Sequence, residues 1–153
     1  YNSLKGSFNA AAAERSLAQW PLPAAKKKNQ PLNMPLIIIA VFFALLAILT
    51  IAPKMSQLAP AQAAVGVVVI IIHLYTLYGI INGNLIGYML IILMSLRNIA
   101  GILQGGISDP KLGMLLAMSA GAILLAFLQK RRLFPNTSWF LRHKRDSDGN
   151  PIF

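Results

Sequence analysis

Four long apolar segments dominate the sequence, and residues that end helices lie between them. The first runs from Leu36 to Ala52 and contains a single polar residue, Thr50. At a rise of about 1.5 Å per residue, a helix of this length nearly spans the hydrocarbon core of a bilayer. The other three segments cover residues 59–81, 85–103 and 112–128. This pattern predicts an all-α polytopic integral membrane protein with four transmembrane helices.

The connection between the second and third segments is very short. It consists of Asn82-Gly83-Asn84, and both residue types tolerate left-handed backbone geometry. A turn of this length requires the two flanking helices to be antiparallel neighbours. Residues 35–129 therefore form the predicted transmembrane domain. An N-terminal arm, residues 1–34, precedes this domain, and a basic tail, residues 130–153, follows it.

The first apolar segment has one alternative interpretation. The Lys26–Lys28 run before it and the alanine-rich stretch at residues 59–63 after it are similar to a signal peptide with its cleavage site. The apolar run is long for a signal peptide, and Lys54 interrupts the region. These two features favour an uncleaved transmembrane helix.

Composition supports the membrane assignment. Only 12% of the residues are charged, against about 25% in ordinary soluble domains. The charged residues between Pro35 and Leu128 are Lys54, Arg97, Asp109 and Lys111. A soluble domain built from this stretch would expose large apolar patches. The chain has no cysteine, which excludes disulfides, thiolate metal sites and a cysteine nucleophile.

The distribution of the net charge of +10 predicts the orientation in the membrane. Eleven of the fourteen Lys and Arg residues flank the apolar block, whereas a nucleic-acid-binding domain would spread them over a folded surface. We therefore expect no nucleic-acid partner. Four spans put both basic ends on one side, and basic flanks favour the inside. Both termini are expected on the cytoplasmic or stromal side of a bacterial inner membrane or an organellar, thylakoid-type membrane.

Basic and aromatic residues in both arms are candidate contacts with lipid or with other membrane protein subunits. Aromatic rings sit well at headgroup depth and dominate the energy of protein interfaces, while Lys and Arg attract anionic lipid. The tail lacks a long apolar segment, so we expect it to be ordered only against another surface. The candidate contacts are Trp20, Arg131, Arg132, Phe134, Trp139 and Phe140.

His73 lies near the centre of the second predicted helix. A neutral imidazole has one acceptor nitrogen, which in a membrane commonly ligates haem iron or chlorophyll magnesium. The other histidine of the chain, His143, lies in the charged tail, so an internal bis-histidine haem is excluded. Single axial ligation of chlorophyll, a haem shared with another subunit, proton transfer and a plain interhelical hydrogen bond all stay open.

Arg97 lies within the third predicted helix, where a guanidinium must pair, line a wet cavity or extend to the boundary. A tie to Asp109 or to carbonyls at helix ends is the structural interpretation. Binding of an anion or lipid headgroup, or pairing with an acidic group of a partner, is the functional one. Asn98 would assist such a contact.

Small residues indicate where helices approach closely. Gly79 and Gly83 have the small-xxx-small spacing near the turn, and so do Gly101 and Gly105. Gly113, Ala117 and Gly121 repeat this spacing on the fourth segment. The spacing is frequent in membrane helices, so it predicts packing without identifying the packing partner.

No catalytic motif is present. The apolar segments hold no carboxylate, and the sequence has no H-E-x-x-H, no G-x-S-x-G and no phosphate-binding glycine loop. Ser95 and His73 could form a serine–histidine pair, but nothing in the sequence orients the imidazole. We therefore expect neither an enzyme nor a metal site.

The features together predict a non-catalytic accessory or assembly subunit of a larger membrane protein complex. Helix packing and the basic, aromatic arms would hold it to its partners. One alternative is a pigment- or haem-binding subunit of a photosynthetic or respiratory complex, using His73. A further alternative is a small oligomeric transporter or channel with Arg97 on its pathway.

Overall fold

The computed structural model describes residues 20–21, 26, 29, 31–105, 109–138, 144–145 and 147. Within these residues the regular elements are helices, and four of them are long and apolar enough to cross a membrane, as the sequence predicted. The elements are η2 (Pro31–Asn33), α3 (Met34–Ile51), η3 (Ala52–Gln57), α4 (Pro60–Asn82), α5 (Leu85–Gly105) and α6 (Pro110–Leu133).

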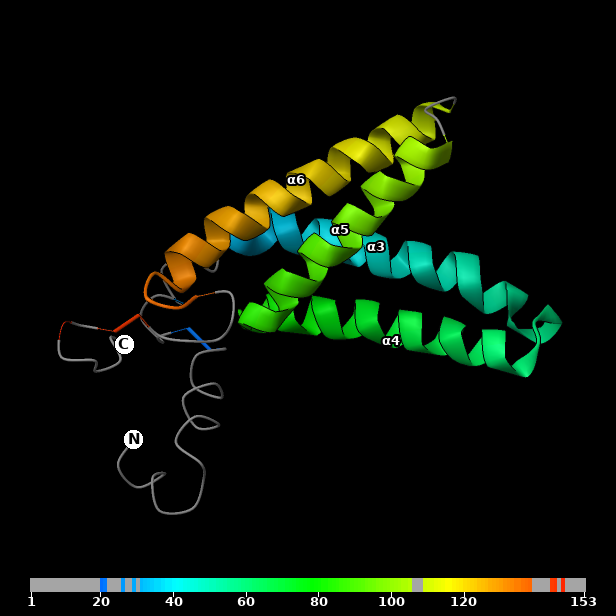
Figure 1. Cartoon of the computed structure of the whole chain (residues 1–153), viewed down its shortest axis with the longest axis horizontal. Coiled ribbons are helices and arrows are strands. Elements are labelled where there is room, and N and C mark those ends of the chain that lie inside the picture. Colours follow the sequence, from blue (N-terminus) through cyan, green and yellow to red (C-terminus); the bar gives the residue numbers. More distant parts are fainter. Residues whose placement is uncertain are drawn as a thin grey trace, which may run out of the picture.

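The four long helices form two antiparallel hairpins, α3 with α4 and α5 with α6 (Figure 1). α4 also packs against α5, and α3 against α6. We call one end of the molecule the closed end: it holds the start of α3, the α4–α5 turn and the end of α6. We call the other end the open end: it holds η3 and the start of α6.

The turn between α4 and α5 has the geometry that its sequence predicted. Gly83 adopts a left-handed conformation with φ of 74°. Its N–H donates to the Ile80 carbonyl at 3.1 Å, and the Asn84 N–H donates to the Gly79 carbonyl at 2.7 Å, which closes the end of α4 in a Schellman motif. The side chain of Asn84 caps the next helix by accepting a hydrogen bond from the Ile86 N–H at 2.9 Å.

Gly79 and Gly87 allow α4 and α5 to touch through their backbones. A Cβ atom added at Gly79 would lie 2.8 Å from the Cα of Gly87, and one added at Gly87 would lie 2.7 Å from the carbonyl carbon of Gly79. Both distances are too short for any other residue. The close packing near this turn therefore pairs Gly79 with Gly87 across the two helices.

The start of α3 is tied to the same region. The side-chain amide of the buried residue Asn33 donates to the Ile80 carbonyl oxygen at 2.7 Å. Pro21 lies beside the turn, because a Cβ added at Gly83 would meet its ring at 3.4 Å. Pro21, Asn33 and the α4–α5 turn thus belong to one packed region at the closed end.

α6 is longer than the sequence predicted at both ends. It begins at Pro110 because the Asp109 side chain caps it, accepting from the Lys111 N–H at 2.8 Å. It continues past Leu128 through Lys130, Arg131 and Arg132 to Leu133. Lys and Arg form helices well and their charge favours a helix C-terminus, so the basic run extends α6. Pro135 then prevents the residue before it from staying helical.

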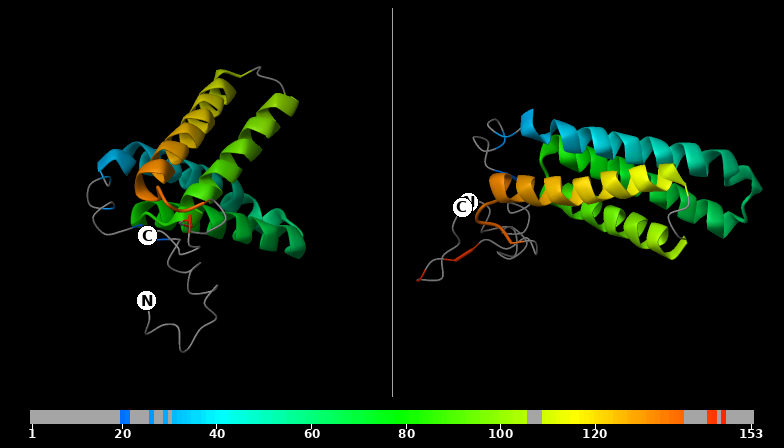
Figure 2. Two further views of the ribbon diagram at one scale, coloured as in Figure 1. Left: turned by 60° about the vertical axis from the view of Figure 1, so that its left-hand side comes forward. Right: turned by 90° about the horizontal axis from the view of Figure 1, so that it is seen from above.

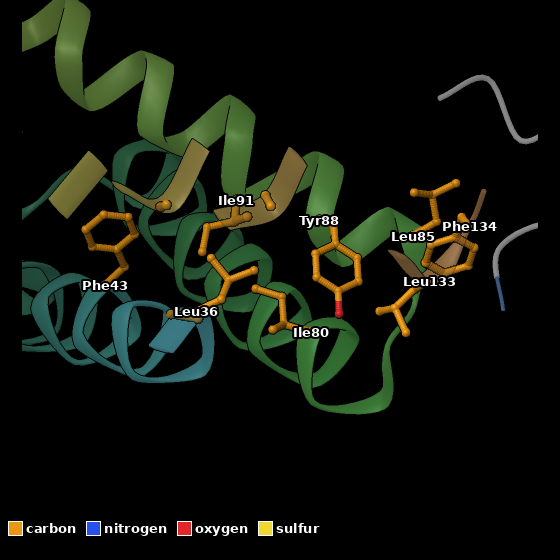
Figure 3. Close-up of a cluster of buried hydrophobic side chains, with 11 residues drawn as sticks. Leu36, Phe43, Ile80, Leu85, Tyr88, Ile91, Leu133 and Phe134 are labelled. Carbon is orange, nitrogen blue, oxygen red and sulfur yellow. The ribbon is translucent and has the colours of Figure 1, made fainter. Parts of the chain in front are cut away.

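The buried core lies in the closed half of the molecule. It is formed by the first half of α3, the end of α4, the first half of α5 and the second half of α6. Figure 3 shows Tyr88 reaching from α5 into this cluster, with Leu133 and Phe134 gathered at one end and Phe43 at the other. The rings of Tyr88 and Phe134 meet edge to face, with their centroids 6.4 Å apart.

The first part of the tail packs on the chain itself, contrary to the expectation from the sequence. The side chain of Phe134 is only 2% exposed, so it belongs to the core and has no free surface to serve as a partner contact. Further along, the Lys144 N–H donates to the Asn136 carbonyl at 2.7 Å, so Lys144 lies back against an earlier part of the tail. The burial of Phe134 could not be predicted from the sequence, because a single ring after a helix end shows no periodicity.

The two hairpins diverge from the closed end toward the open end (Figures 1 and 2). Large apolar side chains of the open half, such as Leu49 and Leu103, are 71% and 65% exposed. The divergence leaves the inner sides of α3, α4 and α5 uncovered in this half, and the candidate site lies there.

The Gly79–Gly87 contact gives a test of the fold. Gly79→Ala should lower the free energy of unfolding by about 1–3 kcal/mol, because the new methyl group forces α4 and α5 apart. The midpoint of detergent-induced unfolding measures this change. Gly101→Ala is the matched control on α5, since nothing lies within 4 Å of its added Cβ, and it should match or exceed the wild type. Equal loss in both variants would contradict the contact.

Candidate functional site

A cleft of about 480 Å³ opens between α3 and α4 in the open half of the molecule. α5 contributes Arg97 and Asn98 to its wall. The cleft extends from η3 at the open end to Phe43 and His73 deeper in the spans. Its polar or charged side chains are Thr50, Lys54, Gln62, His73, Arg97 and Asn98.

Arg97 lies well inside its helix. Gly105, the last residue of α5, is eight positions further along, which places Arg97 about 12 Å from that end of the helix. The guanidinium is exposed to the cleft and has no hydrogen-bond or ionic partner among the described residues. The expected tie to Asp109 does not form, because that carboxylate caps α6.

His73 is half-buried on the α4 side of the cleft. Its Nδ1 lies 2.8 Å from the Val69 carbonyl oxygen. A carbonyl oxygen only accepts, so Nδ1 donates this bond, and Nε2 of the neutral ring is then the acceptor nitrogen. Ser95 lies fully buried, and its hydroxyl has no hydrogen-bond partner among the described residues, so the serine–histidine pair does not form.

The described lining of the cleft carries positive charge. Lys54 lies near its open end and Arg97 in its deeper part, and none of the described lining residues is a carboxylate. Thr50 uses its hydroxyl hydrogen within its own helix, donating to the Leu46 carbonyl at 2.7 Å. Gln62 keeps a free side-chain amide within the described part of the chain. An anion entering the cleft would meet donors from three elements.

A second, smaller cavity adjoins the cleft. This groove of about 250 Å³ runs between α4 and α5, and apart from His73 and Arg97 its lining is apolar. Val69, His73 and Arg97 line both cavities, so they stand where the two meet. The apolar side chains lining the groove are Val69, Ile72, Leu90, Leu93 and Met94.

The structure brings two of the predicted site residues together and leaves the others apart. His73 and Arg97 share the cleft, on neighbouring helices. Trp20, Arg131 and Arg132 are exposed at the closed end, far along the helices from the cleft. Trp139 and Phe140 lie outside the described residues.

Sequence reasoning missed the other polar members of the cleft. Thr50 and Gln62 lie near helix ends, where a polar residue is ordinary, and Lys54 was assigned to a loop. Their common orientation depends on how α3 and α4 pair. The one available signal was that Thr50, Lys54 and Gln62 are all polar interruptions near the same predicted boundary.

The described residues hold no cluster of three or more His, Cys, Asp or Glu side chains able to bind a metal ion. Comparison of the chain with models of protein families, with curated proteins and with solved structures finds no match. The chemistry of the site consists of two cations and an imidazole in the cleft, with the apolar groove beside them.

The absence of cysteine from the sequence allows a direct test of whether water fills the cleft. A thiol reacts with a water-soluble maleimide through its thiolate, which forms only where water reaches. Asn98→Cys, in the cleft, should therefore react on the order of tenfold faster than Leu96→Cys in membrane vesicles. Leu96 is the matched control because it is 50% exposed on α5 but lines neither cavity. Faster labelling at Leu96→Cys would show that the cleft is dry or filled by protein.

Proposed function

We propose that this chain is a non-catalytic membrane subunit that holds an anionic group at Arg97, in the cleft between α3, α4 and α5. One observation carries the proposal. The guanidinium lies deep along α5 and has no partner among the described residues. It faces a cleft whose described lining includes a second cation and no carboxylate.

Placing the charge of Arg97 within a membrane costs free energy. An arginine placed among apolar spans is expensive unless it pairs, reaches water or extends to the boundary. Its five N–H donors form a planar fork that matches phosphate or carboxylate in two parallel hydrogen bonds. An anionic group bound at Arg97 supplies the missing pairing, and the Asn98 amide next to it can donate as well.

The extent of the cleft supports holding a group in place over conducting it across the membrane. The cleft ends at mid-helix, and beyond it lies the packed core at the closed end. The lining residues that the structure describes offer one imidazole but no carboxylate to act with it as an acid–base pair. We therefore favour a binding role over a transporter, a channel or an enzyme.

The proposal includes the accessory role in a larger membrane complex that the sequence predicted. The aromatic and basic side chains exposed at the closed end support this role. Trp20 is 43% exposed, and Arg131 and Arg132 are exposed on the last turn of α6. These side chains are available to anionic lipid or to a partner subunit. Trp139 and Phe140 are proposed to act with them.

A second candidate, a pigment- or haem-binding subunit, is favoured by the orientation of His73. Histidines that ligate metals usually donate their other ring N–H to a carbonyl or carboxylate, as Nδ1 does here to Val69. Nε2 is thereby left as an acceptor at the junction of the two cavities. A haem bound there would need Arg97 to contact its propionates.

Removal of the Arg97 charge tests the anion site. Inorganic phosphate, titrated into the purified chain in an uncharged detergent against chloride of equal ionic strength, should raise the thermal midpoint of the wild type by a few degrees near saturation. Arg97→Gln should abolish this rise. Lys111→Gln is the matched control, since that lysine is exposed at the start of α6 outside the cleft, and should retain it. A rise that persists in Arg97→Gln would refute the proposal.

Absorbance decides the second candidate. If His73 ligates a haem or chlorophyll, protein extracted mildly from its native membrane has a visible absorption band, and His73→Gln loses or shifts it. Under the anion proposal the extract is colourless and the variant assembles normally, because glutamine keeps a hydrogen-bonding side chain. A band that depends on His73 would promote the cofactor role above the anion role.

A further inference from the structure

We infer that the anionic group is the headgroup of an anionic lipid, one of whose acyl chains lies in the apolar groove between α4 and α5. The inference rests on the proposed function, because it assigns the ligand of the same Arg97 site. It adds the chemical class of that ligand and the place of its apolar part.

The junction of two unlike cavities is the first observation. Val69, His73 and Arg97 line both the polar cleft and the apolar groove. A ligand at this junction meets a cation and an imidazole on one side and apolar side chains on the other. Only an amphiphile, with charge at one end and hydrocarbon at the other, uses both sides.

The size and position of the groove select the occupant. The groove has a volume of about 250 Å³ and opens on the side of α4 and α5, where Leu93 is 59% exposed. A helix with its side chains is about 10–12 Å across and is too wide to enter such a groove, whereas an acyl chain is a single file of carbons. A free inorganic anion would leave the groove unused.

The charges of the cleft select an anionic headgroup. Lys54 lies toward the open end and Arg97 deeper, so an anion approaching from the boundary meets one cation and then the other. Gln62 lies near the same end of the cleft and can donate to phosphate oxygens. Met94 at the groove has an unbranched side chain that adapts to a flexible hydrocarbon.

Lipid retention tests the inference on the full chain. The protein is reconstituted in vesicles of equal parts phosphatidylglycerol and phosphatidylcholine with identical acyl chains, re-extracted in a mild detergent and weighed by native mass spectrometry. The wild type should retain phosphatidylglycerol in preference to phosphatidylcholine. Arg97→Gln should reduce that retention on the order of tenfold, because a charge-assisted hydrogen bond to phosphate is lost. Arg97→Lys, which keeps the charge without the fork, should fall between them.

Filling the groove separates this inference from the proposed function. Leu93→Trp should displace the chain and reduce retention severalfold, while Leu96→Trp, on the same helix outside both cavities, should retain lipid as the wild type does. Wild-type retention in Leu93→Trp together with loss in Arg97→Gln overturns the inference and leaves the anion site standing. Wild-type retention in Arg97→Gln overturns both. Equal retention of the two lipids, or an Arg97-dependent polypeptide from the native membrane in place of lipid, also overturns the inference.

Discussion

The backbone contact between Gly79 and Gly87 is the constraint on which the rest of the structure depends. With no side chain between them, α4 and α5 approach at the turn more closely than any other residue pair would allow. Asn33 adds a hydrogen bond from the start of α3 to the Ile80 carbonyl in the same place. Because α4 and α5 are held together at the closed end, their axes can separate toward the open end.

Unequal packing along the helices follows from that constraint. Buried residues such as Tyr88 and Ile80 gather at the closed end, and Phe134 completes the cluster after α6 has ended. Among the described residues the buried cluster does not extend along the open half, where the two hairpins diverge (Figure 2). The molecule therefore combines a packed closed end with two diverging hairpins, and the cavities lie between helices that are packed together at one end.

This arrangement determines what the guanidinium of Arg97 can pair with. Among closely packed helices a guanidinium would need a built-in carboxylate, since an unpaired buried charge is very costly. Between diverging helices it can stay hydrated or bind an anion from outside the chain. The same divergence puts hydrocarbon-lined space beside the charge, because α4 and α5 present apolar side chains to each other up to Val69 and Met94. An amphiphilic ligand matches both surroundings at once.

Local patterns were enough to predict the helices and the turn between α4 and α5. Long apolar runs are helical in a membrane because every backbone group must be paired internally, and Asn82-Gly83-Asn84 has the residues that a left-handed turn needs. His73 and Arg97 were recognisable because polar groups within apolar runs are costly. Tertiary structure alone decided that these two residues share a site, that Gly79 meets Gly87, and that Phe134 is core. Each of these depends on how separate helices pack and diverge, and such contacts between distant segments leave no periodic signal within either one.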